Sequence, residues 1–234
     1  MYWTMFDPMW YVIVGPFILL ALLAQLKVKT AFSRWSREPN RRGVSGAEAA
    51  AVVLRAAGVG DVAIQEHHGF LSDHYDPREK VLRLSAQVFR GRSIASIGVA
   101  AHEAGHALQH AQGYAPLAIR SAIVPMASIG SSLSLPLIFL GLLFPMGGSF
   151  WLLKLGIACF SGVVFFQLVT LPVEFNASSR AKRILAETGL AATAEEVEGV
   201  SSVLSAAALT YVAATLQAIA TLVYYLLLAG RRRG

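Results

Sequence analysis

The stretch AAHEAGHALQH, residues 100–110, places two histidines and a glutamate among alanines and glycines. It lies in a longer segment, GRSIASIGVAAHEAGHALQHAQG, which predicts a helix capped by Ser93. On such a helix His102 and His106 project from one face, one turn apart, with Glu103 beside them. This is the pattern H-E-x-x-H, in which two imidazoles bind zinc and the glutamate is a general base toward a zinc-activated water.

The rest of the chain has the composition of a membrane protein. It is 55% hydrophobic and only 15% charged, with a mean hydropathy of +0.55, whereas soluble domains are about 25% charged. Four segments approach the ~20 apolar residues that cross a bilayer, namely 9–26, 121–145, 150–171 and 206–229. We therefore expect a mainly α membrane protein, with about four transmembrane helices and a small α+β region on one membrane face.

These segments define the expected domain organisation. It comprises an N-terminal transmembrane anchor (1–27), a polar region with the HEAGH helix (28–120), a transmembrane hairpin (121–171), interfacial helices (172–205) and a C-terminal transmembrane helix (206–234). The first apolar segment has neither a basic start nor a small-residue cleavage site, so we expect it to be a retained anchor and not a signal peptide.

The polar regions contain signals for further short elements. A helix is expected after Ser45, with Glu48 in the capping-box position, and another after Thr193, which can continue into the last span. VAIQE and KVLRLS alternate apolar and polar residues around the turn-like DHYDPRE. They predict a small antiparallel sheet of two or three strands. The edge of KVLRLS is expected to accept an extended peptide by β-addition.

A catalytic zinc usually has three protein ligands, so a third is needed. His110 lies eight residues after His102, about 12 Å along a helix, and cannot join it on one ion. The better candidate is Glu174, in LPVEFNASSRAKR, because two spans separate it from His106 and return it to the same membrane face. The alternative is that these are ordinary interfacial charges. Ionisable clusters in membrane proteins are costly, which favours a functional site.

Charge and cysteine content limit the partners and the metal site. The single cysteine, Cys159, excludes an intrachain disulfide and a cysteine-rich metal site. The net charge of +6 comes from residues that flank apolar runs, which argues against nucleic acid and for membrane lipid as a partner. The positive-inside rule states that loops rich in lysine and arginine lie on the cytoplasmic side. Residues 27–45 contain six lysines and arginines and residues 172–205 contain three, so we expect the metal site on the cytoplasmic side and the loop at 146–149 outside. The arginines at 231–233 conflict with this orientation.

Three motifs in order, DHYDP, HEAGHALQH and LPVEFNASSRA, resemble the YugP-like membrane zinc metallopeptidases of bacteria, also called neutral zinc metallopeptidases. The resemblance covers nearly the whole chain. It implies a gluzincin-like peptidase of the bacterial cytoplasmic membrane, with Zn²⁺ as cofactor and a protein or peptide as substrate. It also implies that His102, His106 and Glu174 are metal ligands and Glu103 the catalytic base.

A looser similarity is to the HtpX and CAAX-prenyl membrane proteases, which have E-F-x-A-D where this chain has EFNAS. Ser178 thus replaces an aspartate, and the residue that supports a ligand histidine is unassigned; Asn176 and Asp73 are candidates.

The residue that donates a hydrogen bond to the developing oxyanion is also unassigned. His74, Tyr75 and Arg180 are candidates. The expected function is a zinc metalloendopeptidase that cleaves membrane-proximal or unfolded segments. The alternatives are a site-2-type intramembrane protease, which would carry the motif on a transmembrane helix, and a metal-dependent scaffold or regulator of a partner membrane protein. The glutamate in the motif argues against a scaffold, because a structural zinc needs no base.

Overall fold

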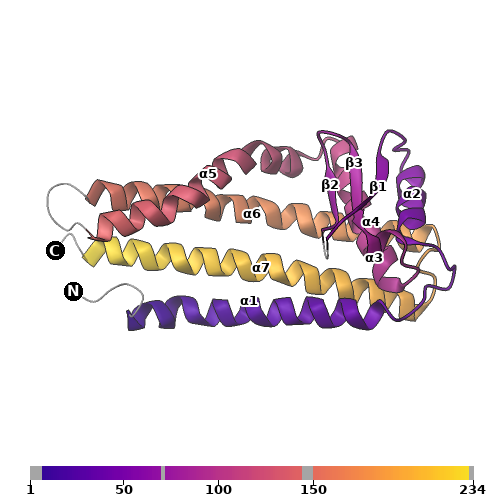
Figure 1. Cartoon of the computed structure of the whole chain (residues 1–234), viewed down its shortest axis with the longest axis horizontal. Coiled ribbons are helices and arrows are strands. Elements are labelled where there is room, and N and C mark those ends of the chain that lie inside the picture. Colours follow the sequence, from indigo (N-terminus) through magenta and orange to yellow (C-terminus); the bar gives the residue numbers. More distant parts are fainter. Residues whose placement is uncertain (1–6, 70–71, 144–149, 232–234) are drawn as a thin grey trace. The chain divides into compact units, whose positions relative to one another are not determined.

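The computed structural model in Figure 1 describes residues 7–69, 72–143 and 150–231. Its elements are, in order, α1 (Pro8–Trp35), α2 (Gly46–Ala56), β1 (Ala63–His67), β2 (His74–Asp76), β3 (Val81–Ser85), α3 (Ala86–Phe89), α4 (Ile94–Ala111), α5 (Ala115–Leu143), α6 (Phe150–Glu187) and α7 (Ala194–Arg231). This confirms a mainly α chain with a small α+β region.

The chain forms two compact units, which are described separately. The helix unit comprises Met1–Leu23, Ile119–Leu171 and Tyr211–Gly234, and the mixed unit comprises Ala24–Ala118 and Pro172–Thr210. Helices α1, α5, α6 and α7 each contribute residues to both units.

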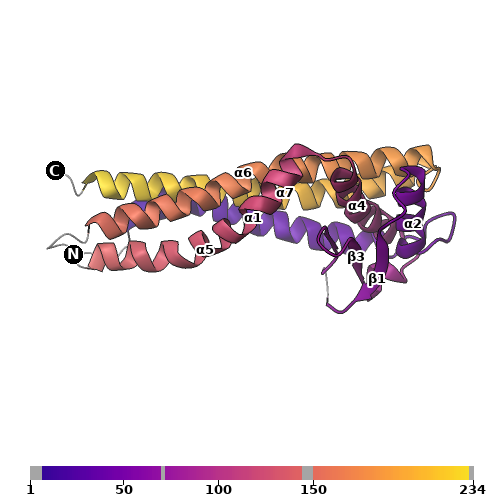
Figure 2. The same ribbon diagram turned by 90° about the horizontal axis from the view of Figure 1, so that it is seen from above.

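The helix unit has the properties expected of membrane spans. Helices α1, α5, α6 and α7 are each long and apolar enough to cross a bilayer, which confirms the four predicted segments. Within this unit α5 and α6 lie side by side (Figure 2) and approach closely at glycines. A Cβ at Gly156 would lie 2.9 Å from the Ser134 carbonyl oxygen, so only glycine permits this spacing. The predicted loop at 146–149 lies outside the described residues.

The core of the mixed unit surrounds α4. Its buried apolar side chains come from α1, α2, β3, α3, α4, α6 and α7, and include Phe32, Trp35, Val53, Leu82, Leu84, Val88, Ile97, Leu108, Leu185 and Leu204. Burial of such side chains is the main stabilising contribution to this unit. Helix α4 is therefore covered by other elements along most of its length.

The sheet differs from the antiparallel one that the sequence predicted. The strand order is β1-β3-β2; β2 pairs with β3 antiparallel, but β1 pairs with β3 in parallel. Strand β2, His74–Asp76, lies in the stretch DHYDPRE, which the sequence predicted to be only a turn. The strand KVLRLS is central, so the prediction that its edge is free was wrong. The physical reason is that four of its five residues are buried, as is typical of a strand covered on both faces.

The predicted helix caps are present. Ser45 Oγ accepts from the Glu48 N–H at 3.2 Å while the Glu48 carboxylate accepts from the Ser45 N–H at 2.6 Å, which is the expected capping box. Thr193 and Glu196 make the same exchange at the start of α7, and α7 continues into the last apolar segment as predicted.

Helix α6 corrects the expectation of separate interfacial helices after residue 171. It runs unbroken from Phe150 to Glu187, with Pro172 inside it. A proline removes one backbone hydrogen bond, and membrane helices tolerate this loss when their neighbours compensate. Here the residues just beyond the proline are packed: Val173, Ala177 and Ala181 are completely buried. That burial favours a continuous helix, so the apolar segment and the segment with Glu174 belong to the same element, α6.

Candidate metal centre

Helix α4 brings the two motif histidines together. Ser93 caps the helix as predicted, its Oγ accepting from the Ser96 N–H at 3.1 Å. The rings of His102 and His106 lie edge to face with centroids 4.9 Å apart. Between them, Gly105 allows α6 to approach, because a Cβ there would lie 2.8 Å from the Ala177 carbonyl oxygen. The small residues of the motif therefore set the spacing between the two helices.

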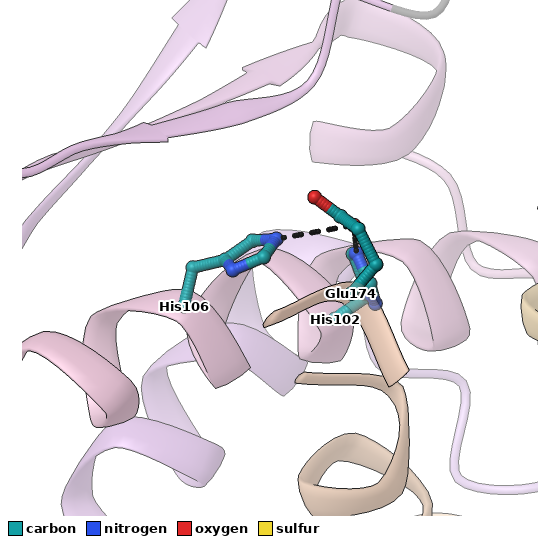
Figure 3. Close-up of side chains that lie close together, drawn as sticks. All are labelled: His102, His106 and Glu174. Atoms are coloured by element: carbon teal, nitrogen blue, oxygen red, sulfur yellow. Dashed lines mark hydrogen bonds and ion pairs between the residues drawn. The ribbon is translucent and has the colours of Figure 1, made fainter. Parts of the chain in front are cut away.

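Helix α6 supplies Glu174, which is 2% exposed and lies between the two imidazoles (Figure 3). Its Oε2 is 3.2 Å from His102 Nε2 and 3.6 Å from His106 Nε2. Ligand atoms bound tetrahedrally to zinc at ~2.0–2.1 Å lie about 3.3 Å from one another. The ligand atoms of all three residues lie within 4.8 Å of one another. Two imidazoles and one carboxylate at these separations fit a zinc ion, and three protein ligands are typical of catalytic zinc.

The charges in the centre favour a cation. Burial by itself raises the pKa of Glu174, but hydrogen bonds from His102 and His106 outweigh it and hold that pKa well below its usual range. Burial lowers the pKa of His106, yet the hydrogen bond to Glu174 and the charges of Glu103 and Glu174 raise it overall. Glu174 is thus a buried carboxylate that remains ionised, and it needs positive charge beside it.

Glu103 has a different environment from Glu174. Burial raises its pKa, the two histidines lower it, and the charges of Glu174 and Asp73 raise it further, so the result lies above the usual value. Its side chain is partly exposed, and no described residue donates a hydrogen bond to it. A carboxylate beside the metal ligands, with a raised pKa and no fixed partner, is suited to accepting a proton.

The second nitrogen of each histidine is also engaged. His102 Nδ1 lies 3.1 Å from Ser178 Oγ, and His106 Nδ1 lies 3.0 Å from Gln109 Oε1. Such contacts orient ligand imidazoles in metal sites. Sequence reasoning did not find Gln109, although its place three residues after His106 on the same helix was an available signal. The sequence singled out Ser178 only because it stands where the HtpX and CAAX-prenyl proteases have an aspartate, and not as a partner of His102.

The two predicted supporting residues, Asp73 and Asn176, are hydrogen-bonded to residues other than the ligand histidines. The Asp73 carboxylate accepts from the Ser85 N–H at 2.7 Å and from its hydroxyl, and Asn176 contacts Gln109 instead of a histidine. His110 Nδ1 lies 2.8 Å from the Tyr75 hydroxyl, which joins the end of α4 to β2.

All three candidate oxyanion donors already have polar partners. Tyr75 contacts His110, and Arg180 donates from Nε to Asn176 Oδ1 at 2.6 Å. The third, His74, lies on β2 with its Nδ1 2.8 Å from the Ser72 carbonyl oxygen. The structure brings none of them into contact with the three ligands, so a catalytic role for each stays a prediction.

Comparison with known proteins adds independent information. The family described as "Putative neutral zinc metallopeptidase" matches residues 10–230. The protein "Putative membrane protease YugP" of Bacillus subtilis (strain 168) is 48% identical over 209 residues, which cover 89% of this chain and 91% of that relative. No solved structure matches the chain.

Proposed function

This chain belongs to the neutral zinc metallopeptidase family, and from that premise we propose that it is a membrane-bound zinc endopeptidase. The observation that carries the proposal is the convergence of His102, His106 and Glu174 from two helices, with Glu103 beside them. A purely structural zinc usually has four protein ligands and needs no base. Among the described residues the centre has three ligands and an adjacent carboxylate to which none of them donates a hydrogen bond, and this supports hydrolysis.

The residues of the chain have distinct roles in this proposal. His102, His106 and Glu174 would hold the ion, because their Nε2 and Oε2 atoms converge. When bound, zinc polarises the scissile carbonyl and lowers the pKa of an attacking water. The Glu103 carboxylate takes a proton from that water and passes it to the leaving amine, and a raised pKa makes that carboxylate a stronger base.

The proposed substrates are membrane-proximal or unfolded protein segments. The four apolar helices keep the enzyme at a membrane, and the positive-inside rule favours the cytoplasmic side for the metal centre. An extended peptide that adds a strand to the sheet must pair with β1 or β2, because β3 has a partner on both sides. Of these two, β2 contacts α4, the helix that carries the motif.

The location of the motif argues against a site-2-type intramembrane protease. Helix α4 is not among the four described helices that are apolar enough to span a bilayer, and it lies within the core of the mixed unit. A metal-dependent scaffold remains the main competitor. Only a measurement of hydrolysis separates it from a peptidase.

The test measures zinc content and cleavage of an unfolded reporter peptide on the same purified samples. We expect wild type to bind one zinc and to cleave, Glu103→Gln to keep the metal and lose at least ~100-fold in rate, and Glu174→Ala to lose both. Glu198→Gln, the same change at an exposed position of α7, is the matched control and should behave as wild type. Cleavage by Glu103→Gln at the wild-type rate refutes the mechanism, and zinc binding without cleavage by any form favours the scaffold.

A further inference from the structure

Gln109 is a completely buried amide that joins the two helices of the metal centre. Its exposed fraction is 0%, and it lies on α4 three residues after His106. Its Oε1 is 3.0 Å from His106 Nδ1, and its Nε2 donates to the Val173 carbonyl oxygen at 2.8 Å. Val173 immediately precedes Glu174 on α6. One side chain therefore contacts a ligand on one helix and the backbone next to a ligand on the other.

The direction of these hydrogen bonds is set by two groups of α6 with fixed roles: the Val173 carbonyl oxygen, which can only accept from Gln109, and an arginine farther along the helix. Arg180 Nε can only donate, and it lies 2.6 Å from Asn176, so the Asn176 atom that faces it must be the oxygen. That same Oδ1 lies 3.0 Å from Gln109, so the Gln109 atom that faces it must be the NH₂ nitrogen. The carbonyl oxygen of Gln109 then necessarily points at His106.

The consequence reaches the metal centre. An amide oxygen can only accept, so His106 Nδ1 must donate to it and carry the proton. In the neutral form that binds a metal, the other nitrogen, Nε2, gives up the proton that it shares with Glu174 and presents its lone pair. Nε2 is the atom that faces Glu174 Oε2 at 3.6 Å, and it is therefore the atom available to a metal.

We infer that Arg180, Asn176 and Gln109 form a hydrogen-bond relay. The relay fixes the tautomer of His106 and holds its ring in place beside Glu174. Gln109 is therefore a positioning residue for zinc. The inference rests on the proposed function, because it assumes that the ligands bind zinc. It also gives Arg180 a role that sequence reasoning did not consider. Gln109 never touches the substrate; it acts through His106.

The test compares the zinc dissociation constants of purified full-length variants, measured by competition with a chromophoric chelator. Gln109→Met keeps the size of the side chain but cannot accept from His106, and we expect about 10- to 100-fold weaker zinc binding. The matched control is Gln65→Met, the same change at an exposed position of β1. Within the described residues its side chain makes no hydrogen bond to Arg180, Asn176 or Gln109, so the zinc affinity of this variant should stay within about threefold of wild type.

A second pair of variants tests the relay at its middle residue. Asn176→Asp keeps an acceptor for both Arg180 and Gln109 and should bind zinc nearly as wild type, whereas Asn176→Leu removes that acceptor and should bind about tenfold less tightly. This pair decides the question if Gln109→Met does not fold. The melting temperature of each metal-free variant is measured in parallel, because a merely structural role lowers that temperature without changing zinc affinity.

The outcomes separate this inference from the proposed function. If wild type binds zinc and Gln109→Met binds it equally well, or if the two Asn176 variants have equal affinities, the relay is overturned while the peptidase proposal stands. If wild type binds zinc but does not cleave, the peptidase proposal fails while the relay is still judged by the order of affinities. If wild type binds no zinc, both are overturned.

Discussion

Replacing Gly105 with alanine tests the close approach of α4 to α6 at the metal centre. The added Cβ would lie 2.8 Å from the Ala177 carbonyl oxygen and 3.3 Å from its carbonyl carbon. Both are backbone atoms and cannot rotate away as the end of a flexible side chain can. Ordinary contact begins at 3.4 Å, so α6 must move by about 0.6 Å, the difference between 3.4 and 2.8 Å.

The magnitude follows from two opposing effects. Alanine favours a helix over glycine by about 1 kcal/mol, whereas overpacking a tight contact costs about 1–3 kcal/mol. Glu174 lies three residues before Ala177 and moves with the helix. Its Oε2 would then lie farther than the present 3.2 and 3.6 Å from the two Nε2 atoms. We expect zinc affinity to fall at least ~10-fold, equivalent to about 1.4 kcal/mol.

Gly98→Ala is the matched control, on the same helix and equally buried. A Cβ there would lie 3.6 Å from the Val200 side chain, which is ordinary contact, so this variant should gain stability by up to about 1 kcal/mol. The helix propensity gain is the same in both variants, so their difference isolates the overpacking, about 1–3 kcal/mol. Denaturant unfolding of the metal-free proteins and chelator competition measure the two quantities. Equal stability and equal zinc affinity of the two variants would refute the reasoning.

Three further predictions concern single hydrogen-bonding groups. Ser178→Ala should weaken zinc binding several-fold in chelator competition, because His102 Nδ1 loses its partner at 3.1 Å; an unchanged affinity would contradict a supporting role. Ser93→Ala removes the cap of α4 and should lower the free energy of unfolding by about 1 kcal/mol; circular dichroism melts measure this, and no change in melting temperature counts against it. Burial raises the pKa of Glu196, but hydrogen bonds from the N–H groups of Arg41 and the α7 start outweigh it and hold the pKa below its usual value. Its ionised form therefore stabilises the fold above the unfolded pKa of about 4.3, and this contribution is lost as pH falls through the lower folded pKa. Glu196→Gln should cost about 1–2 kcal/mol at pH 7 and progressively less below pH ~4; a pH-independent difference in unfolding free energy would refute the charge effect.

The sequence by itself determined the elements whose signals are local. The apolar segments predicted four spans because crossing a bilayer requires about 20 apolar residues in succession. Ser45 with Glu48, and Thr193 with Glu196, predicted helix starts because a capping box involves only residues three apart. The HEAGH motif placed His102 and His106 together for the same reason, since helix periodicity alone puts side chains at i and i+4 on one face.

The tertiary structure decided what depends on contacts between distant residues. The parallel pairing of β1 with β3 and the central place of β3 follow from burial on both faces, which the alternation in KVLRLS did not reveal. The continuity of α6 through Pro172 depends on how the following residues pack, and no local rule specifies that packing. Topology predicted that Glu174 returns to the face of the motif, but only the fold places its Oε2 3.2 Å from His102 Nε2. Gln109 shows the reason most clearly. Its place three residues after His106 puts it near a ligand, but its role comes from the oxygen and nitrogen atoms that another helix places around it.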